Sequence, residues 1–504
     1  MVKNYILGID IGTHESKGVI TNKDGVVLAD ALCSHDLVIP KPGCAEHKAC
    51  SWWKDFIFLT KELLSKTGIE GKNISAVGCS AITPTMLPLD DKGKPLRNAI
   101  LYGIDNRAAD EIVEMTNNIG KDKLLEHNGI LLSSQAVGPK ILWFMRNEPK
   151  LFKSTSRIVT ATTYLVYCLT GRFVVDYYSA STFNPMFDCR EKKWTDTLWP
   201  DAPLNLLPEL AWATDIAGEI TEEAARQTGL KAGTKVIVGT ADASAEAVSS
   251  GVVRSGDLMV MYGTSTFFIQ IVDEFAKSIN VWPTVYLQPD LYAIAAGMST
   301  SGAIMSWFRD LLEAYSYQDL DKLAQKVPAG AEGLLALPYF SGERTPINDP
   351  NARGVILGLS LYHKKGHVFK ALLEAIAYGI RDNIESIEKS GLPVRRAVAI
   401  GGGTKSSVLL QTVSDVTKLN QHVPEITLGA CYGDAYLAAL GMGYYKSLED
   451  VLNWIEWDKK IIPIEKNTFL YDEYFKLYKD LYQAIFQISH KLISISKSAR
   501  IFDD

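Results

Sequence analysis

The 504-residue sequence lacks several features that would assign it to a specialised class of protein. No apolar run approaches the ~18 to 20 residues of a membrane-spanning helix. Asp10 interrupts the only apolar run near the N-terminus, so we expect no signal peptide. The seven cysteines are an odd number without metal-site spacing, which favours reduced thiols and a cytoplasmic location. A net charge of -6 offers no basic surface for nucleic acid. What remains is an ordinary globular composition in a chain too long for one hydrophobic core.

Two common nucleotide-binding motifs are also missing. The sequence contains neither the P-loop pattern GxxxxGK followed by Ser or Thr, nor the pattern GxGxxG. A nucleotide site in this chain would therefore have to be built from other turns.

The stretch Lys235–Val253, near the middle of the chain, contains the first candidate for chemistry. Lys235–Val238 predicts a short buried strand, because three β-branched apolar residues follow the lysine. A single acid, Asp242, comes next, and a run of small residues then predicts a tightly packed helix. Open α/β sheets bind ligands at the carboxyl ends of their strands, so Asp242 is a candidate catalytic group. The alternative is that Asp242 caps the helix.

A strand, a turn of Gly, Thr and Ser residues, and a returning strand occur twice, about half a chain apart. The first copy spans Ile6–Ile20 and carries Asp10 before its turn, and the second spans Leu258–Val272. Free backbone N–H groups in such turns suit a phosphate, although either copy alone also fits a plain β-hairpin. The repetition weakens that alternative and predicts an internally duplicated fold. A third glycine-rich turn follows the predicted strand Ala397–Ile400.

These parts are the ones that phosphoryl transfer requires. Backbone N–H groups bind the phosphates, acids such as Asp10 hold Mg²⁺, and a base such as Asp242 takes the proton of the attacking hydroxyl. The residues by themselves therefore predict a nucleotide-dependent enzyme of duplicated α/β design.

The motifs around these residues resemble those of the FGGY carbohydrate kinases, and most closely their xylulokinase-like branch. Six segments carry the resemblance, in family order, over roughly residues 4 to 445: GIDIGTHESKG, VGTADAS, MYGTST, SGERTPINDPNARGVILGLS, GGGTKSS and GDAYLAALGMG. The resemblance implies an α/β fold of two RNase H-like domains, of the actin and sugar-kinase type, with a cleft between them. It implies a sugar-binding domain over residues 1–250 and an ATP-binding domain over residues 251–504.

The resemblance also implies roles for single residues. Asp242 matches the family's general base, and Asp10 and Asp242 match the acids at the Mg²⁺ site. The positions implied to bind ATP are Gly12, Thr13, Lys17, Gly263, Thr264, Ser265, Gly302, Met305, Gly402, Gly403 and Ser406. The positions implied to contact the sugar are Thr83, Pro84, Thr85, Asp105 and Ala243.

The sugar side departs from the family in three places. Ala81–Thr85 stands where xylulokinases carry a GQMHG-like segment, and Ala243 stands where Asn or Gln is common. Gly103 holds the Trp position of the family's Trp-x-Asp-x-Arg motif. Because a site that cannot satisfy a sugar hydroxyl discriminates against it strongly, we expect D-xylulose to be at best a secondary substrate.

The predicted function is ATP-dependent phosphorylation of a hydroxyl of a small sugar, first of all a ketopentose such as xylulose or a related ketose. The alternatives within the family are a polyol or glycerol kinase and a gluconate kinase. An actin-like structural or sensor protein is the alternative of another class, against which the SGERTP loop and the small residues after Asp242 argue. We expect the sugar and ATP as partners, with neither nucleic acid nor membrane. The sequence leaves the oligomeric state open, a homodimer included.

Overall fold

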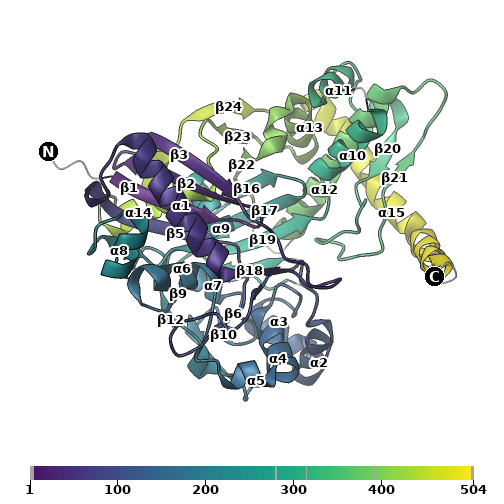
Figure 1. Ribbon diagram of the computed structural model, residues 1–504. Helices are drawn as coiled ribbons and strands as arrows, with labels where there is room; N and C mark the ends of the chain where they lie inside the picture. The colour runs from purple at the N-terminus through teal and green to yellow at the C-terminus, as the bar shows by residue number, and fades with distance from the viewer. Residues whose placement is uncertain (1–4, 279–280, 314, 390–392, 501–504) are drawn as a thin grey trace.

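Two mixed β-sheets form the framework of the protein in the computed structural model, which describes residues 5–278, 281–313, 315–389 and 393–500 (Figure 1). The first sheet has the order β13-β14-β5-β1-β2-β3, with β15 beside β5. Its strands are β1 (Tyr5–Ile11), β2 (Glu15–Asn22), β3 (Val27–Ser34), β5 (Ile74–Ala81), β13 (Ile216–Glu219), β14 (Lys235–Ile237) and β15 (Thr240–Ala241). The second sheet has the order β18-β19-β17-β16-β22-β23-β24. Its strands are β16 (Asp257–Tyr262), β17 (Thr266–Val272), β18 (Trp282–Val285), β19 (Tyr292–Met298), β22 (Arg396–Ile400), β23 (Gln421–Pro424) and β24 (Trp457–Ile461).

The two sheets repeat one pattern of strand directions. In the first, β1, β2 and β3 form an antiparallel meander, β5 and β14 run parallel to β1, and β13 is antiparallel to β14. In the second, β16, β17 and β19 form the meander, β22 and β23 run parallel to β16, and β24 is antiparallel to β23. The predicted duplicated α/β fold is therefore confirmed, and the repeated strand–turn–strand units are β1–β2 and β16–β17.

Helices α9 (Asp242–Ser249) and α14 (Ala430–Gly441) lie between the two sheets (Figure 1). Their apolar side chains share one buried cluster with strands β1, β2 and β5 of the first sheet and with β16 and β17 of the second. The small residues of both helices permit very close packing. A Cβ atom added to Gly433 of α14 would lie 1.9 Å from the carbonyl oxygen of Ala245 in α9. The glycine- and alanine-rich sequence of these helices thus brings residues from distant parts of the chain together at the strand ends.

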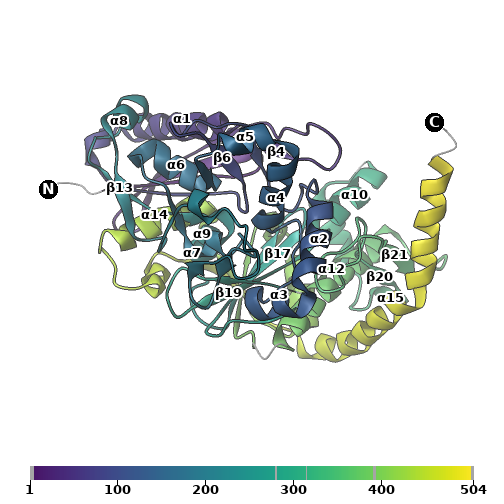
Figure 2. The same cartoon turned by 90° about the horizontal axis from the view of Figure 1, so that it is seen from below.

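The outer face of each sheet is covered by its own helices. Residues of α1 (Ala49–Thr67), α6 (Ala161–Thr170) and α8 (Glu222–Thr228) share a buried cluster with the first sheet. The helices packed with the second sheet are α10 (Gly302–Leu312), α11 (Tyr317–Ala324), α12 (Lys365–Glu388), α13 (Ser407–Thr417) and α15 (Glu465–Arg500). The far end of α15 projects beyond the body of the molecule (Figure 2).

A lobe built from the segment between β6 (Leu87–Leu89) and β12 (Glu209–Ala211) extends below the first sheet in Figure 1. Its helices include α2 (Ala109–Ile119), α3 (Lys121–Asn128), α4 (Val137–Asn147) and α5 (Pro149–Lys153). The lobe has small apolar clusters of its own. Within the described ranges, every helix of the protein is too short or too polar to cross a membrane.

Candidate active site

Three cavities adjoin one another through shared lining residues, which come from both halves of the chain. We name them after residues that line them: the Asp242 cavity of about 360 Å³, the Asp10 cavity of about 310 Å³ and the Ser406 cavity of about 400 Å³. Glu246 lines both the Asp242 and the Asp10 cavities. Gly402 and Lys405 line both the Asp10 and the Ser406 cavities. A ligand in the first cavity and a ligand in the third can therefore meet at the second.

Asp242 lies at the carboxyl end of β15, which pairs in parallel with β5. The interpretation of Asp242 as a helix cap is wrong, because Ala241 is the N-cap residue of α9 and Asp242 begins the helix. Its Oδ1 accepts a hydrogen bond of 2.8 Å from the backbone N–H of Ala243. Burial raises the pKa of Asp242 to about 7, and the charge of Glu246 adds to this effect. The carboxyl group can therefore exchange a proton near neutral pH.

Asp10 lies near the end of β1, beside a second buried acid from the other half of the chain. The hydroxyl of Ser80 in β5 donates to Asp434 Oδ2 of α14 at 2.7 Å and lies 3.2 Å from Asp10 Oδ1. Burial, followed by the charges of Asp242 and Glu246, raises the pKa of Asp10 well above its usual range. Burial and the charge of Asp10 do the same to the pKa of Asp434. The site thus concentrates negative charge that a bound cation would balance.

Two of these acids were not predicted from the sequence. Glu246 lies four residues after Asp242 on α9, and this spacing puts both side chains on one helix face. That spacing was a usable signal for Glu246. Asp434 is the acid of the GDAYLAALGMG segment, which marked it as a candidate, but its contact with Asp10 depends on the packing of α14.

The residues predicted to bind ATP are distributed along the cleft. Those that line the Ser406 cavity are Gly263, Thr264, Gly302, Met305, Gly402, Gly403 and Ser406. Lys17 lines the Asp10 cavity, whereas Thr13 and Ser265 line the Asp242 cavity. Gly12 lines none of the three cavities, and its N–H donates to the carbonyl oxygen of Glu15 and closes the first turn at 3.1 Å. Tyr317, Gln318, Asp321 and Lys405 also line the Ser406 cavity and were not predicted.

The predicted sugar contacts divide into two groups. Thr83, Pro84 and Ala243 line the Asp242 cavity. Thr85 does not, because its side chain is fully buried and accepts a hydrogen bond of 2.8 Å from the N–H of Ala161. Asp105 is also buried and does not line the cavity, because its carboxylate pairs with Arg107 and accepts from the N–H of Ala45. We therefore correct the prediction for Thr85 and Asp105, which support the wall from behind.

Several residues of the Asp242 cavity were not predicted to be site residues, although Phe267 and Arg344 lie within segments that the sequence analysis singled out. Tyr102, Gln135, Tyr178 and Thr182 belong to the first half of the chain, and Phe267, Trp282, Thr284 and Arg344 belong to the second. The hydroxyl of Tyr102 lies 3.1 Å from that of Thr13 and so joins the first turn to this wall.

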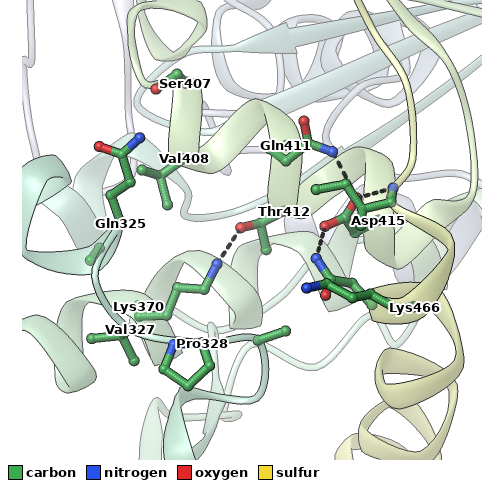
Figure 3. A pocket seen from close by; sticks show the side chains of 14 residues that line it. Gln325, Val327, Pro328, Lys370, Ser407, Val408, Gln411, Thr412, Asp415 and Lys466 are labelled. Carbon is green, nitrogen blue, oxygen red and sulfur yellow. Dashed lines mark hydrogen bonds between the residues drawn. The ribbon is translucent and has the colours of Figure 1, made fainter.

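A separate cavity of about 470 Å³ lies against α13 (Figure 3). Lys370 donates to Thr412 at 2.9 Å, and Gln411 donates to Asp415 at 2.8 Å, so these polar side chains satisfy one another. None of the residues predicted for catalysis or binding lines this cavity. We therefore confine the candidate active site to the three adjoining cavities.

Comparison with known proteins finds one family in both halves of the chain. Residues 5–249 match the N-terminal domain, and residues 258–442 the C-terminal domain, of the FGGY family of carbohydrate kinases. Xylulose kinase of Bacillus subtilis is 29% identical over 500 residues, which cover 98% of this chain and 100% of that protein. The crystal structure of xylulose kinase from Rhodospirillum rubrum has a TM-score of 0.91 at 30% identity, and the match covers 97% of this chain and 100% of that one. Gluconate kinase from Lactobacillus acidophilus has a TM-score of 0.89 at 25% identity, with 96% and 98% covered.

Proposed function

The chain belongs to the FGGY family of carbohydrate kinases, and from this premise we propose that it transfers the γ-phosphoryl group of ATP to a hydroxyl of a ketopentose or a related ketose. The observation that carries the proposal is the row of three adjoining cavities from the Asp242 cavity to the glycine-lined Ser406 cavity. A sugar at one end and ATP at the other would bring the hydroxyl and the γ-phosphate together beside Asp10 and Asp242. The similarity to xylulose kinases over nearly the whole chain supports a ketopentose as the acceptor.

In this proposal Asp242 is the general base. A carboxylate with a pKa of about 7 can accept the proton of a sugar hydroxyl at neutral pH, which suits such a base. A positioned base typically contributes a factor of ~10² to 10⁴ in rate. Backbone N–H groups at Thr264 and Gly402 would bind the phosphates and fix the geometry of attack, whereas the N–H of Gly263 donates to carbonyl oxygens of its own turn.

We propose that Mg²⁺ binds in the Asp10 cavity and that Asp10 holds it. Asp242, the proposed second acid, lines the adjoining cavity rather than this one. Among the described residues, no group of three or more His, Cys, Asp or Glu side chains is arranged to hold a metal alone. Protein-bound Mg²⁺ commonly uses one or two carboxylates together with water and phosphate oxygens, and Asp10 and Glu246 both line this cavity. When bound with ATP, the ion would neutralise charge that develops on the phosphates.

We propose a sugar-binding domain over residues 1–250 and an ATP-binding domain over residues 251–504. The strand order of each half supports this division. Each half also contributes to the other's site, since Arg344 lines the Asp242 cavity and α14 carries Asp434 to Asp10. The domains would therefore close on the sugar and ATP together, as hinged kinases do.

The test is ADP release with Mg²⁺ and ATP over a panel of ketoses, polyols and aldonates. We expect at least one ketose to reach a kcat/KM in the ~10⁴ M⁻¹s⁻¹ range of ordinary enzymes. ATP turnover that no sugar stimulates would contradict the proposed function.

A further inference from the structure

The turn before α4 holds the backbone of Gly103, the neighbour of Tyr102, which lines the Asp242 cavity. The hydroxyl of Ser134 donates to the carbonyl oxygen of Gly103 at 3.2 Å, and the N–H of Gly103 donates to Gln135 Oε1 at 3.2 Å. The side chain of Lys140, buried in α4, donates to the carbonyl oxygens of Leu101 and Tyr102. Four hydrogen bonds therefore fix residues 101–103 against the start of α4, and the wall is preorganised.

The amide of Gln135 occupies the space that a side chain at position 103 would need. A Cβ atom added to Gly103 would lie 2.6 Å from Gln135 Nε2 and 2.9 Å from its Cδ. A tryptophan at position 103, where the family's Trp-x-Asp-x-Arg motif has one, would therefore displace Gln135. The exchange of Trp for Gly103 is thus matched by Gln135, which comes from another element and itself lines the cavity.

The hydrogen bond to Gly103 also fixes which way the amide faces. Since Oε1 accepts from the backbone N–H of Gly103, the NH₂ group of Gln135 must point elsewhere. No hydrogen bond to another described residue uses that NH₂ group. It is therefore a donor held in place at the cavity wall with its hydrogen-bonding capacity free.

A second donor-only group lines the same cavity from the other half of the chain. Arg344 donates through Nη2 to the carbonyl oxygen of Met298, and its buried Nε has no hydrogen-bond partner among the described residues. The acids of the cavity, Asp242 and Glu246, can only accept when ionised. The Nε of Arg344 is buried and does not face the cavity, so the NH₂ group of Gln135 is the fixed donor that faces the acceptors for a reacting hydroxyl.

We propose that Gln135 is a specificity-determining residue, whose NH₂ group donates to an sp² oxygen on the sugar, away from the hydroxyl that is phosphorylated. The inference rests on the proposed function and refines its substrate class to sugars with a carbonyl or carboxylate oxygen. A polyol hydroxyl could also accept from Gln135, but it would have to turn its own hydrogen away from this donor towards another acceptor, whereas an sp² oxygen has no hydrogen to place. Because a buried donor without a partner is costly, the polyol should be used roughly 10- to 100-fold less efficiently.

The first measurement is kcat/KM for five-carbon acceptors that differ in one functional group. Each ketopentose is compared with the polyol formed by its reduction, for example D-xylulose with xylitol, and with the aldonate of the same carbon skeleton. We expect the sp² compound to exceed its polyol at least tenfold. Comparing the ketose with the aldonate shows whether the recognised oxygen belongs to a carbonyl or to a carboxylate group. A polyol used as well as its ketose and aldonate would overturn the inference.

The second measurement uses Gln135→Glu, which keeps the shape and the acceptor for Gly103 but replaces the NH₂ donor by an acceptor. We expect kcat/KM for the preferred sp² substrate to fall at least tenfold, mainly through KM, while KM for ATP stays unchanged. The kcat/KM for the polyol should change little, because the new carboxylate can accept a hydrogen bond from the polyol hydroxyl. Asn117→Asp on α2, an exposed amide-to-acid change, is the matched control and should behave as the parent protein.

Gln135→Met provides a second variant should the acidic one fail to fold, and it should also lose the preference for the sp² compound. Calorimetric binding of the ketose and its polyol separates this inference from the proposed function. A ketose preference that Gln135→Met abolishes, in a protein that releases no ADP with any sugar, would support the inference and reject the kinase activity. An unchanged ketose-to-polyol ratio in folded variants would overturn the role of Gln135.

Discussion

A rate that rises with pH is the most direct consequence of the half-buried position of Asp242. Burial is the larger cause, and the charge of Glu246 the smaller, of a pKa raised from the ordinary 3.8 to about 7. A general base works only when it is deprotonated, so a raised pKa means that activity is gained as the pH rises through 7. About one-tenth of the carboxyl is ionised at pH 6 and about nine-tenths at pH 8, so kcat/KM for the sugar should increase about tenfold between them.

Replacing Glu246 by Gln tests the cause of that pH dependence. Without the neighbouring charge the pKa of Asp242 should fall, so the acid limb of the profile should move to lower pH. The pKa of Asp242 should nevertheless remain well above 3.8, because the carboxyl group is still shielded from solvent in this variant. The assay is ADP release at saturating Mg²⁺ and ATP and limiting sugar, in buffers of constant ionic strength. Glu70→Gln, an exposed acid far from the cleft, serves as the control. A flat profile between pH 5.5 and 8, or a limb that Glu246→Gln leaves in place, would refute the reasoning.

Three further variants and one scattering measurement test the remaining assignments. Asp242→Asn should fold and bind ATP, as a thermal shift would show, but lose at least ~10²-fold in kcat because an amide cannot accept the proton; turnover within about tenfold of the parent would sink the assignment. Asp10→Ala should lose Mg²⁺-dependent turnover and keep its circular dichroism spectrum, and normal rates across a Mg²⁺ titration would contradict the metal role. Gly433→Ala should lower the free energy of unfolding in urea by about 3 kcal/mol, since its Cβ would meet the carbonyl oxygen of Ala245 at 1.9 Å; Gly402→Ala, where a Cβ meets open space, should cost much less. Small-angle scattering should show compaction with sugar and a non-hydrolysable ATP analogue together, and an unchanged radius would argue for a rigid cleft.

The nucleotide end of the cleft could be predicted because its parts are local. Each turn consists of a few small residues after a strand and is followed at once by a strand or a helix, so a short motif specifies its shape. Gly263, Thr264, Gly402 and Gly403 come from two such turns, and all four line the Ser406 cavity. The duplicated sheet was predictable for the same reason, since the repeated unit is contiguous in the chain. The contact of Asp434 with Asp10 was not, because only the packing of α14 between the sheets brings the two acids together.

The wall of the Asp242 cavity could not be predicted in the same way, because residues from distant parts of the chain form it by tertiary packing. The resemblance could show that Gly103 stands at a position where the family carries a tryptophan, but not what occupies the space beside it. That space is filled by Gln135, which lies 32 positions further along the chain and is fixed by the backbone of Gly103 itself. Neither residue implies the other by spacing or residue type. The exchange of a tryptophan for Gly103 therefore does more than remove a contact with the sugar. It replaces an apolar side chain by the hydrogen-bond donor of Gln135. Substrate preference in this family then has to be inferred from what occupies the vacated space, and Gln135 and Gly103 should be mutated as a pair before either is judged alone.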